Sequence, residues 1–211
     1  GHEWFGNSIT SKDIADMWIH EGFTTYTETV FIECVKGYDE AIKYVNGQSR
    51  SVRNDRPVIA QFGVNKEGSG DMYYKGALML NTIRHIINDD AKWWKLLYNY
   101  SETYKKQIID TKTVIDYFNK ESGLDLTSVF NQYLTTTKIP KLVLSKTGNK
   151  LSYEWQNVNT DFKMPVDIVI NEKTIRLHPT TSKQETKIDK KIKLENIQVK
   201  TNQFFIKVEK K

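Results

Sequence analysis

Apolar residues recur every three or four positions along the first two-thirds of the chain. In the segment 12–35 this spacing, which puts side chains on one face of a helix, holds within two groups of residues: Ile14, Met17 and Trp18, and then Phe23, Tyr26 and Val30. The same period predicts further helices over 38–49, 72–87, 91–107, 111–123 and 126–136. The stretch 56–70 follows no period and contains a proline and three glycines, so a loop is predicted there.

The first of these helices carries signals at both of its ends. Ser11 or Asp13 can act as its N-cap, because a short polar side chain accepts a hydrogen bond from the free amides of the first turn. Gly37 stands where the helical pattern stops, which is the usual place for a glycine that ends a helix.

The hydrophobic period changes near residue 138. Pro140 interrupts the helical pattern, and beyond it short runs alternate between apolar and polar residues, which is typical of strands. Gly148-Asn149 favours a hairpin turn between the first two runs. We therefore predict an α+β protein with a helical domain over 1–137 and a small antiparallel β-sandwich over 138–211. The predicted strands cover 141–145, 150–156, 164–170, 173–178, 191–200 and 203–210.

The composition allows a real hydrophobic core and argues against two kinds of architecture. With 211 residues, of which 38% are hydrophobic, the chain is long enough for one large or two small domains. No stretch approaches the roughly 18 consecutive apolar residues of a membrane-spanning helix. Cys34 is the only cysteine, so no disulfide can form within the chain.

Positive charge is concentrated in the last third of the chain. Residues 138–211 contain 16 lysines and arginines against 8 acidic residues, a net charge of +8, whereas 1–137 carry a net charge of −3. An independent interaction domain for polyanions is one interpretation, and salt-sensitive binding of 138–211 to a polyanion would favour it. The lysines alternate with apolar residues, however, as on the solvent face of strands. We therefore predict no nucleic-acid partner.

A spacing of acidic and histidine residues indicates metal chemistry. His2 and Glu3 open the chain, and Glu21 follows His2 after 18 intervening residues, inside the sequence Trp-Ile-His-Glu-Gly-Phe. This arrangement resembles the aminopeptidase N family of zinc metallopeptidases (gluzincins), in which His-Glu-x-x-His is followed by 18 residues and a glutamate. The resemblance is strongest over 2–28 and 71–84, where Tyr-Tyr-Lys-Gly is similar to the family's Tyr-x-Lys-Gly.

The resemblance implies a fold, a metal and a set of ligands. Residues 1–137 would be the helical C-terminal half of a thermolysin-like catalytic domain, followed by the β-sandwich. His2 and Glu21 would bind one Zn²⁺, an ion that takes three protein ligands and a water in catalytic sites. Glu28, two turns beyond Glu21, would accept a hydrogen bond from the second ring nitrogen of His2. His20 is expected to pack or hydrogen-bond beside the site rather than to bind the metal.

The resemblance also implies a catalytic tyrosine and a peptide substrate. Tyr73 would donate a hydrogen bond to the oxyanion that forms when water attacks the scissile carbonyl of a peptide. Two residues on, Lys75 is expected to be a solvated lysine, and Gly76 is expected to let two helices pack closely.

Part of the family's site is not found in these 211 residues. The first histidine and the catalytic glutamate would stand four and three residues before His2, and the amine-binding segment further upstream. We therefore expect a fragment that is inactive alone, with His2 loosely held at a frayed end. The alternative is a non-catalytic relative that uses the same fold as a binding scaffold, with a basic β interaction domain. Retention of His2, Glu21 and Tyr73 argues against that alternative.

Overall fold

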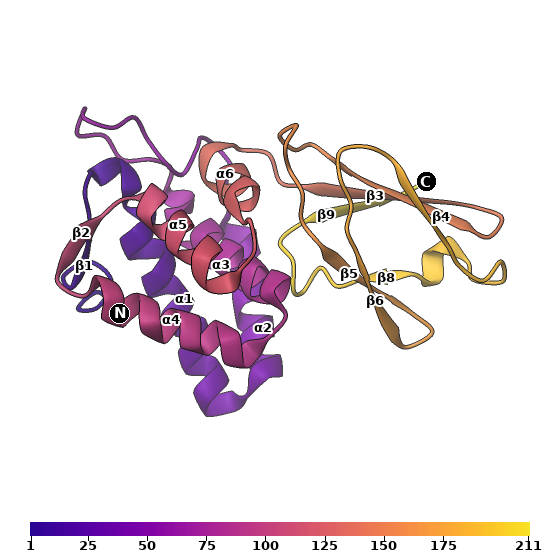
Figure 1. Cartoon of the computed structure of the whole chain (residues 1–211), viewed down its shortest axis with the longest axis horizontal. Coiled ribbons are helices and arrows are strands. Elements are labelled where there is room, and N and C mark those ends of the chain that lie inside the picture. Colours follow the sequence, from indigo (N-terminus) through magenta and orange to yellow (C-terminus); the bar gives the residue numbers. More distant parts are fainter. The chain divides into compact units, whose positions relative to one another are not determined.

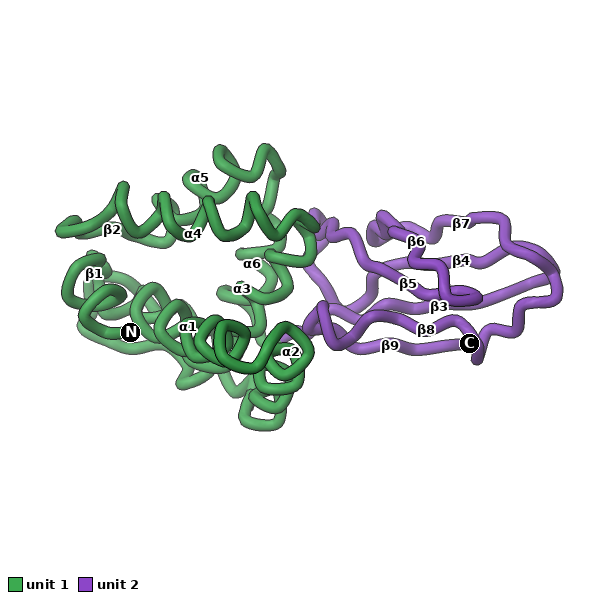
Figure 2. Tube along the Cα trace, turned by 90° about the horizontal axis from the view of Figure 1, so that it is seen from below, with its two compact units in different colours: residues 1–137 green, residues 138–211 purple.

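The computed structural model describes all 211 residues. It divides into two units, and most of the first unit is helical. The units are Gly1–Thr137 and Lys138–Lys211, which meet where the hydrophobic period of the sequence changes (Figure 2). The helices of the first unit are α1 (Trp18–Lys36), α2 (Tyr38–Gly47), α3 (Tyr74–Ile87), α4 (Asp90–Tyr104), α5 (Thr111–Ser122) and α6 (Thr127–Thr135) (Figure 1). Segment 56–70, predicted to be a loop, contains only the first residue of the short 3-10 helix η3 (Gly70–Met72).

The start of α1 shows how local polar groups set a helix boundary. Asp13 accepts a hydrogen bond from the Ala15 amide, 2.9 Å away, and caps the short 3-10 helix η1 (Ile14–Asp16) rather than α1 itself. The α-helix begins at Trp18 and ends at Lys36, and the next residue, Gly37, has φ 87°, a value that favours glycine. The predicted helix is therefore present, but its first six residues belong to a cap and a 3-10 turn.

Stacked aromatic rings hold the helices of the first unit together. Phe23 of α1 stacks on Tyr100 of α4 at 4.9 Å between ring centroids, and Phe118 of α5 meets both rings edge-on. Trp18 and Phe130 of α6 continue the cluster. All five side chains are buried, and each contributes on the order of 2–3 kcal/mol by leaving water.

Two short strands in the helical unit were not predicted. The strands β1 (Ile9–Ser11) and β2 (Gln107–Ile109) pair in parallel, with Thr10 opposite Ile108. Three residues are too few to show an alternating pattern, and a parallel pair joins segments that lie far apart in the sequence. Sequence periodicity alone could not reveal this pairing.

Lys75 is buried, contrary to the expectation of a solvated lysine. Its side chain is fully enclosed, and its ammonium group donates a hydrogen bond of 2.7 Å to the carbonyl of Thr136, just after α6. Burial lowers the pKa of Lys75 to about 8, against the opposing effect of Asp71 and Asp55. A lysine is usually exposed to solvent, and for that reason Lys75 was expected to be solvated. The carbonyl group at the end of α6 has no partner within the helix, however, and Lys75 donates the hydrogen bond that this group needs.

The buried lysine makes stability depend on pH in a defined window. In the unfolded chain its pKa returns to about 10.5, so between pH 8 and 10.5 the unfolded state binds more protons and the folded state gains stability as pH rises. We expect the unfolding free energy of the wild type, relative to Lys75→Met, to rise across this window by up to about 3 kcal/mol. Denaturant unfolding at several pH values measures it. Lys95→Met, which removes an exposed lysine, is the control; a flat difference for Lys75→Met would contradict the assignment.

The second unit consists of two small sheets. One has the order β7-β4-β3-β9 and the other the order β6-β5-β8, and only the β3–β9 pair is parallel. Gly148, with φ 59°, and Asn149 form the predicted two-residue turn between β3 and β4. The strands are β3 (Lys141–Thr147), β4 (Lys150–Gln156), β5 (Val166–Ile170), β6 (Lys173–Leu177), β7 (Gln184–Lys187), β8 (Gln198–Val199) and β9 (Lys207–Lys210).

Most predicted strands of this unit are present, with one clear error. Segment 191–200 contains the 3-10 helix η4 (Leu194–Asn196) and only the two residues of β8, whereas the unpredicted β7 lies before it. The alternation of lysine and apolar residues in 191–200 resembles a strand, but the burial of Ile197 is achieved in an irregular segment. None of the helices in either unit is long and apolar enough to cross a membrane.

Candidate active site

A short hydrogen-bonded turn holds His2 in place. The amides of Trp4 and Phe5 donate to the carbonyl of Gly1 at 2.9 and 3.0 Å, and the amide of Asn7 donates to the carbonyl of His2 at 3.0 Å. Phe5 is buried and stacks on Phe23 at 5.2 Å, which anchors the turn to α1. The structure therefore places the backbone of His2 in a hydrogen-bonded turn, and the aromatic residue that anchors this turn was not recognised in the sequence.

This turn brings His2 next to Glu21 in the first turn of α1. The Nε2 atom of His2 lies 3.6 Å from Oε2 of Glu21. Two donors on one tetrahedral zinc ion, each about 2 Å from the metal, lie about 3.3 Å apart. The imidazole and the carboxylate are also ligand types that zinc prefers, so the pair fits two positions of a zinc site.

The two donors differ in their contact with water. The side chain of His2 is 61% exposed and that of Glu21 is 11% exposed. Burial raises the pKa of the Glu21 carboxyl above its ordinary value, the neighbouring His2 opposes this shift, and Glu67 reinforces it. A nearby cation would therefore relieve the cost of keeping Glu21 ionised.

His20 takes the supporting position expected for it. Its Nε2 atom accepts a hydrogen bond of 2.7 Å from the amide of Ser11, which fixes the ring against β1. Burial, and to a smaller extent the nearby His2, lower the pKa of His20, so the ring is neutral at pH 7. This hydrogen bond occupies one of the two ring nitrogens of His20 that could bind a metal.

Two glycines set the distance between Glu21 and Tyr73. Gly22 of α1 and Gly76 of α3 touch: a Cβ atom built on Gly76 would lie 2.9 Å from the Cα of Gly22. The prediction that Gly76 allows close helix packing is therefore confirmed. Tyr73 stands at the N-terminal end of α3, one turn before this crossing, and Glu21 lies directly before Gly22.

Tyr73 faces solvent on one side and the acidic part of the site on the other. Its side chain is 39% exposed, enough for contact with a ligand. Partial burial, followed by the charges of Glu21 and Glu67, raises the pKa of the Tyr73 phenol. The hydroxyl therefore keeps its proton at neutral pH and can donate a hydrogen bond.

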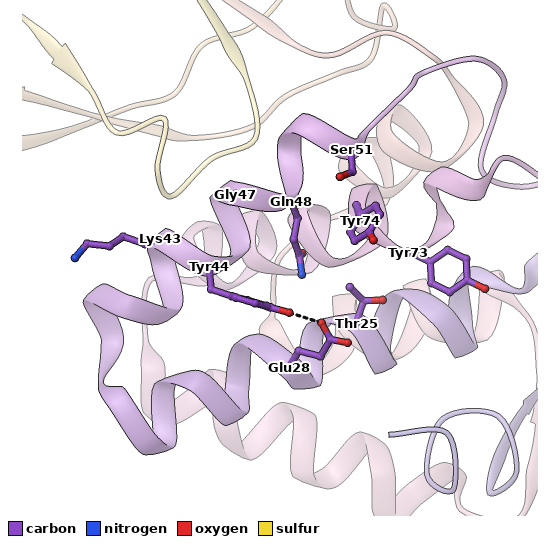
Figure 3. Close-up of a pocket in the computed structure, with 9 residues that line it drawn as sticks. All are labelled: Thr25, Glu28, Lys43, Tyr44, Gly47, Gln48, Ser51, Tyr73 and Tyr74. Carbon is purple, nitrogen blue, oxygen red and sulfur yellow. Dashed lines mark hydrogen bonds between the residues drawn. The ribbon is translucent and has the colours of Figure 1, made fainter.

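Glu28 is joined to a different partner from the one expected. One of its carboxylate oxygens accepts a hydrogen bond of 2.5 Å from the hydroxyl of Tyr44 on α2 (Figure 3). Glu28 and His2 are not hydrogen-bonded to each other in this structure, so the predicted contact between them stays a prediction. Both Glu28 and Tyr44 line a hollow that also reaches Tyr73.

Other polar residues of this hollow escaped the sequence analysis. Tyr44 and Gln48 lie in segments whose only sequence signal is helical periodicity, and no motif marks them. They come next to Glu28 because α2 packs against α1, which is a property of the tertiary structure. No set of three or more histidine, cysteine or acidic side chains in the chain could hold a metal ion, so the His2–Glu21 pair stands without a third protein ligand.

The helical unit resembles a domain of a known protein family. Residues 1–133 match the model of the peptidase family M1 domain. The chain belongs to this family.

Several curated aminopeptidases are similar to this chain over about two-thirds of its length or more. Probable aminopeptidase 2 of Sulfurisphaera tokodaii is 24% identical over 97% of this chain and 28% of its own length. Aminopeptidase B of Rattus norvegicus is 25% identical over 66% of this chain and 25% of its own length. The chain thus spans about a quarter of the length of these relatives.

One solved structure matches nearly the whole chain, and a second matches about two-thirds of it. Aminopeptidase A of Legionella pneumophila, crystallised with aspartic acid, matches 99% of this chain and 26% of its own, with a TM-score of 0.73 and 14% identity. An M1 zinc metallopeptidase of Deinococcus radiodurans, crystallised as an E323A mutant with a Tyr-Ser-Ala substrate, matches 66% of this chain and 32% of its own, with a TM-score of 0.57 and 25% identity. The α+β fold class predicted from the sequence is confirmed.

Proposed function

We propose that this chain is part of a longer zinc-dependent aminopeptidase that removes N-terminal residues from peptides. The observation that carries the proposal is the convergence of His2 and Glu21 to 3.6 Å, with Tyr73 near enough for the charge of Glu21 to raise the pKa of its phenol. Membership of the M1 family supports the peptidase chemistry, and the aminopeptidase relatives support cleavage at the N-terminus of the substrate.

His2 and Glu21 are the two residues of this chain that would hold the metal. When bound, zinc would polarise the scissile carbonyl and acidify a water molecule, which is its general role in hydrolases. Glu21 contributes a buried negative charge, and the turn of residues 1–7 keeps the imidazole of His2 aimed at it. The third protein ligand is proposed to lie in a segment outside these 211 residues.

Tyr73 is proposed to act on the substrate itself. Its phenol keeps its proton at neutral pH, and it can donate that proton in a hydrogen bond to the oxygen that gains charge during attack on the carbonyl. The contact between Gly22 and Gly76 would hold the phenol at a fixed distance from Glu21, as orientation of catalytic groups requires.

The test of this function is hydrolysis by the longer protein in which this chain continues upstream. We expect it to release the chromophore from aminoacyl chromogenic substrates, to lose this activity with a chelator and to regain it with zinc. Absence of turnover in a folded, zinc-loaded protein would instead favour the non-catalytic scaffold.

Glu28 is proposed to help hold the metal through His2. One of its carboxylate oxygens accepts a hydrogen bond from Tyr44. The other oxygen would accept a hydrogen bond from the second ring nitrogen of His2. In the longer, zinc-loaded protein we expect Glu28→Gln to weaken zinc binding roughly 10–100-fold, the usual effect of losing such a partner. Competition with a chromogenic chelator measures it, with Glu102→Gln, at a partly exposed position on α4, as the control. Equal zinc affinity in the two variants would remove Glu28 from this role.

A further inference from the structure

The place of the Tyr73 phenol depends on the main chain that carries it, because 39% of the residue is exposed. The contacts of this main chain with α1 converge on Gly22. A Cβ atom built on Gly22 would lie 3.2 Å from the carbonyl oxygen of Met72 and 3.3 Å from the Cα of Gly76, on the two sides of Tyr73. Contacts with a single residue set a distance, but they do not by themselves restrain a rotation about that residue. A further attachment is needed to fix the direction of the phenol.

Asp71, two residues before Tyr73, supplies such an attachment. The residue is 1% exposed and lies in the 3-10 helix η3, which leads into Tyr73. One of its carboxylate oxygens accepts a hydrogen bond of 2.8 Å from the amide of Arg53, and the other accepts one of 2.7 Å from the amide of Asn54. Hydrogen bonds to an ionised group are roughly twice as strong as neutral ones. Asp71 therefore ties the main chain before Tyr73 to a segment 18 and 17 residues earlier in the chain.

The segment 53–58, which donates these amides, is itself fixed to the helical unit. The hydroxyl of Ser69, directly before η3, donates a hydrogen bond of 2.5 Å to the carboxylate of Asp55. The amide of Val58 donates a hydrogen bond of 2.9 Å to the carbonyl of Leu134 in α6. Asp71 is thus attached to a part of the chain that is held from two sides.

Lys75, in the first turn of α3, compensates the buried charge of Asp71. Its ammonium group is buried and donates to the carbonyl of Thr136 at 2.7 Å. Burial lowers the pKa of Lys75, and the charge of Asp71, followed by that of Asp55, acts against this shift. Removing one member of a buried charge pair leaves the other without compensation. The attachment therefore has its own counter-charge on the element that it positions.

We propose that Asp71 is a positioning residue for Tyr73: its carboxylate fixes the direction in which the phenol points beside Glu21. The proposal rests on the aminopeptidase function proposed above and adds a residue to it. Asp71 lies outside the Tyr-Tyr-Lys-Gly sequence that singled out Tyr73, and its burial keeps it from touching a substrate. A displacement of about 1 Å can cost a catalyst roughly 10²-fold, so loss of the attachment should appear in turnover.

The experiment replaces Asp71 by asparagine in the longer, active protein. Asp71→Asn keeps the shape of the side chain but converts one acceptor oxygen into an NH₂ donor that faces a main-chain amide. We expect turnover to fall roughly 10–100-fold, and the Michaelis constant to change by less than about threefold. The control is Asp110→Asn, which removes a carboxylate that accepts from the amide and the hydroxyl of Thr113 at the cap of α5. It should leave turnover unchanged.

A second substitution separates positioning from general damage to the fold. In a Tyr73→Phe background there is no hydroxyl to direct, so Asp71→Asn should lower the remaining turnover by less than about twofold. Equal losses in the two backgrounds would show that Asp71 acts through another group and would overturn the proposal. If Asp71→Asn does not fold, an ester oxygen in place of the amide N–H of Asn54 removes one of the hydrogen bonds and keeps every side chain, and the same comparison applies to it.

A measurement on the 211-residue chain needs no catalysis. Tyrosine labelled with ¹³C in its ring reports the order of the Tyr73 ring by NMR relaxation and its direction by residual dipolar couplings. We expect Asp71→Asn to change these values and Asp110→Asn to leave them as in the wild type. Unchanged values in Asp71→Asn would overturn the positioning role. A changed ring in a protein whose longer form hydrolyses nothing would overturn the proposed aminopeptidase function and leave Asp71 as the residue that directs Tyr73.

Discussion

The 211-residue chain, incubated with zinc and an aminoacyl chromogenic substrate, is expected to show no turnover. Its only paired candidates for zinc binding are His2 and Glu21, and no third histidine, cysteine or acidic side chain joins them. By resemblance, the first histidine and the general base belong to a segment before His2. Groups that act as a unit do not contribute additively, so the loss of a ligand and the base together should leave essentially nothing.

The same assay on the longer protein supplies the comparison. Joining the chain to its upstream segment is expected to restore chelator-sensitive hydrolysis, and replacing the upstream catalytic glutamate by glutamine should abolish it again. Strong, chelator-sensitive turnover by the isolated chain would show that the base has been assigned to the wrong part of the protein. Zinc binding by the isolated chain, followed by calorimetry, should be weak because two protein ligands are fewer than a catalytic site uses.

Tyr73→Phe in the active longer protein is expected to lower turnover by about 10²–10³-fold, the effect of removing one donor to a developing oxyanion. The ring is kept, so the packing at the start of α3 should not change. Because the proposed interaction forms in the transition state, the Michaelis constant should change far less than turnover does. Steady-state kinetics with a single substrate separates the two parameters.

An exposed tyrosine outside the site is the matched control. Tyr98 on α4 is 67% exposed, and Tyr98→Phe should leave both kinetic parameters at the wild-type values. A loss below tenfold for Tyr73→Phe would mean that the phenol does not stabilise the oxyanion. A rise in the Michaelis constant without a fall in turnover would instead assign Tyr73 to substrate binding alone.

The helices could be predicted from sequence because their signals are local. Amphipathic periods, the glycine at position 37 and the break at Pro140 are each contained in a few neighbouring residues. The strand pair β1–β2 and the irregular segment 191–200 depend on contacts between distant parts of the chain, so the local pattern missed the first and misassigned the second.

In the candidate site, too, residues marked by a local motif could be predicted, whereas contacts between distant segments could not. His2, Glu21 and Tyr73 could be chosen because a fixed spacing connects them, and the structure brings the first two within 3.6 Å. The hydrogen bond between Glu28 and Tyr44 could not be predicted from the sequence. A residue on this face of α1 can contact either a neighbouring helix or a metal ligand, and the sequence pattern is the same in both cases. Lys75 was misjudged for a related reason: its acceptor, the carbonyl of Thr136, lies 61 residues away.

The contact between Gly22 and Gly76 has a mechanical consequence for the site. No side chain separates the two backbones, so there is no soft layer that could absorb a change in their spacing. Whatever displaces α3 by an ångström displaces Tyr73 by the same amount relative to Glu21. Errors of that size can cost a catalyst about two orders of magnitude. The contact between the two glycines therefore fixes the spacing of α1 and α3 at the van der Waals radii of main-chain atoms, and with it the separation of Glu21 and Tyr73.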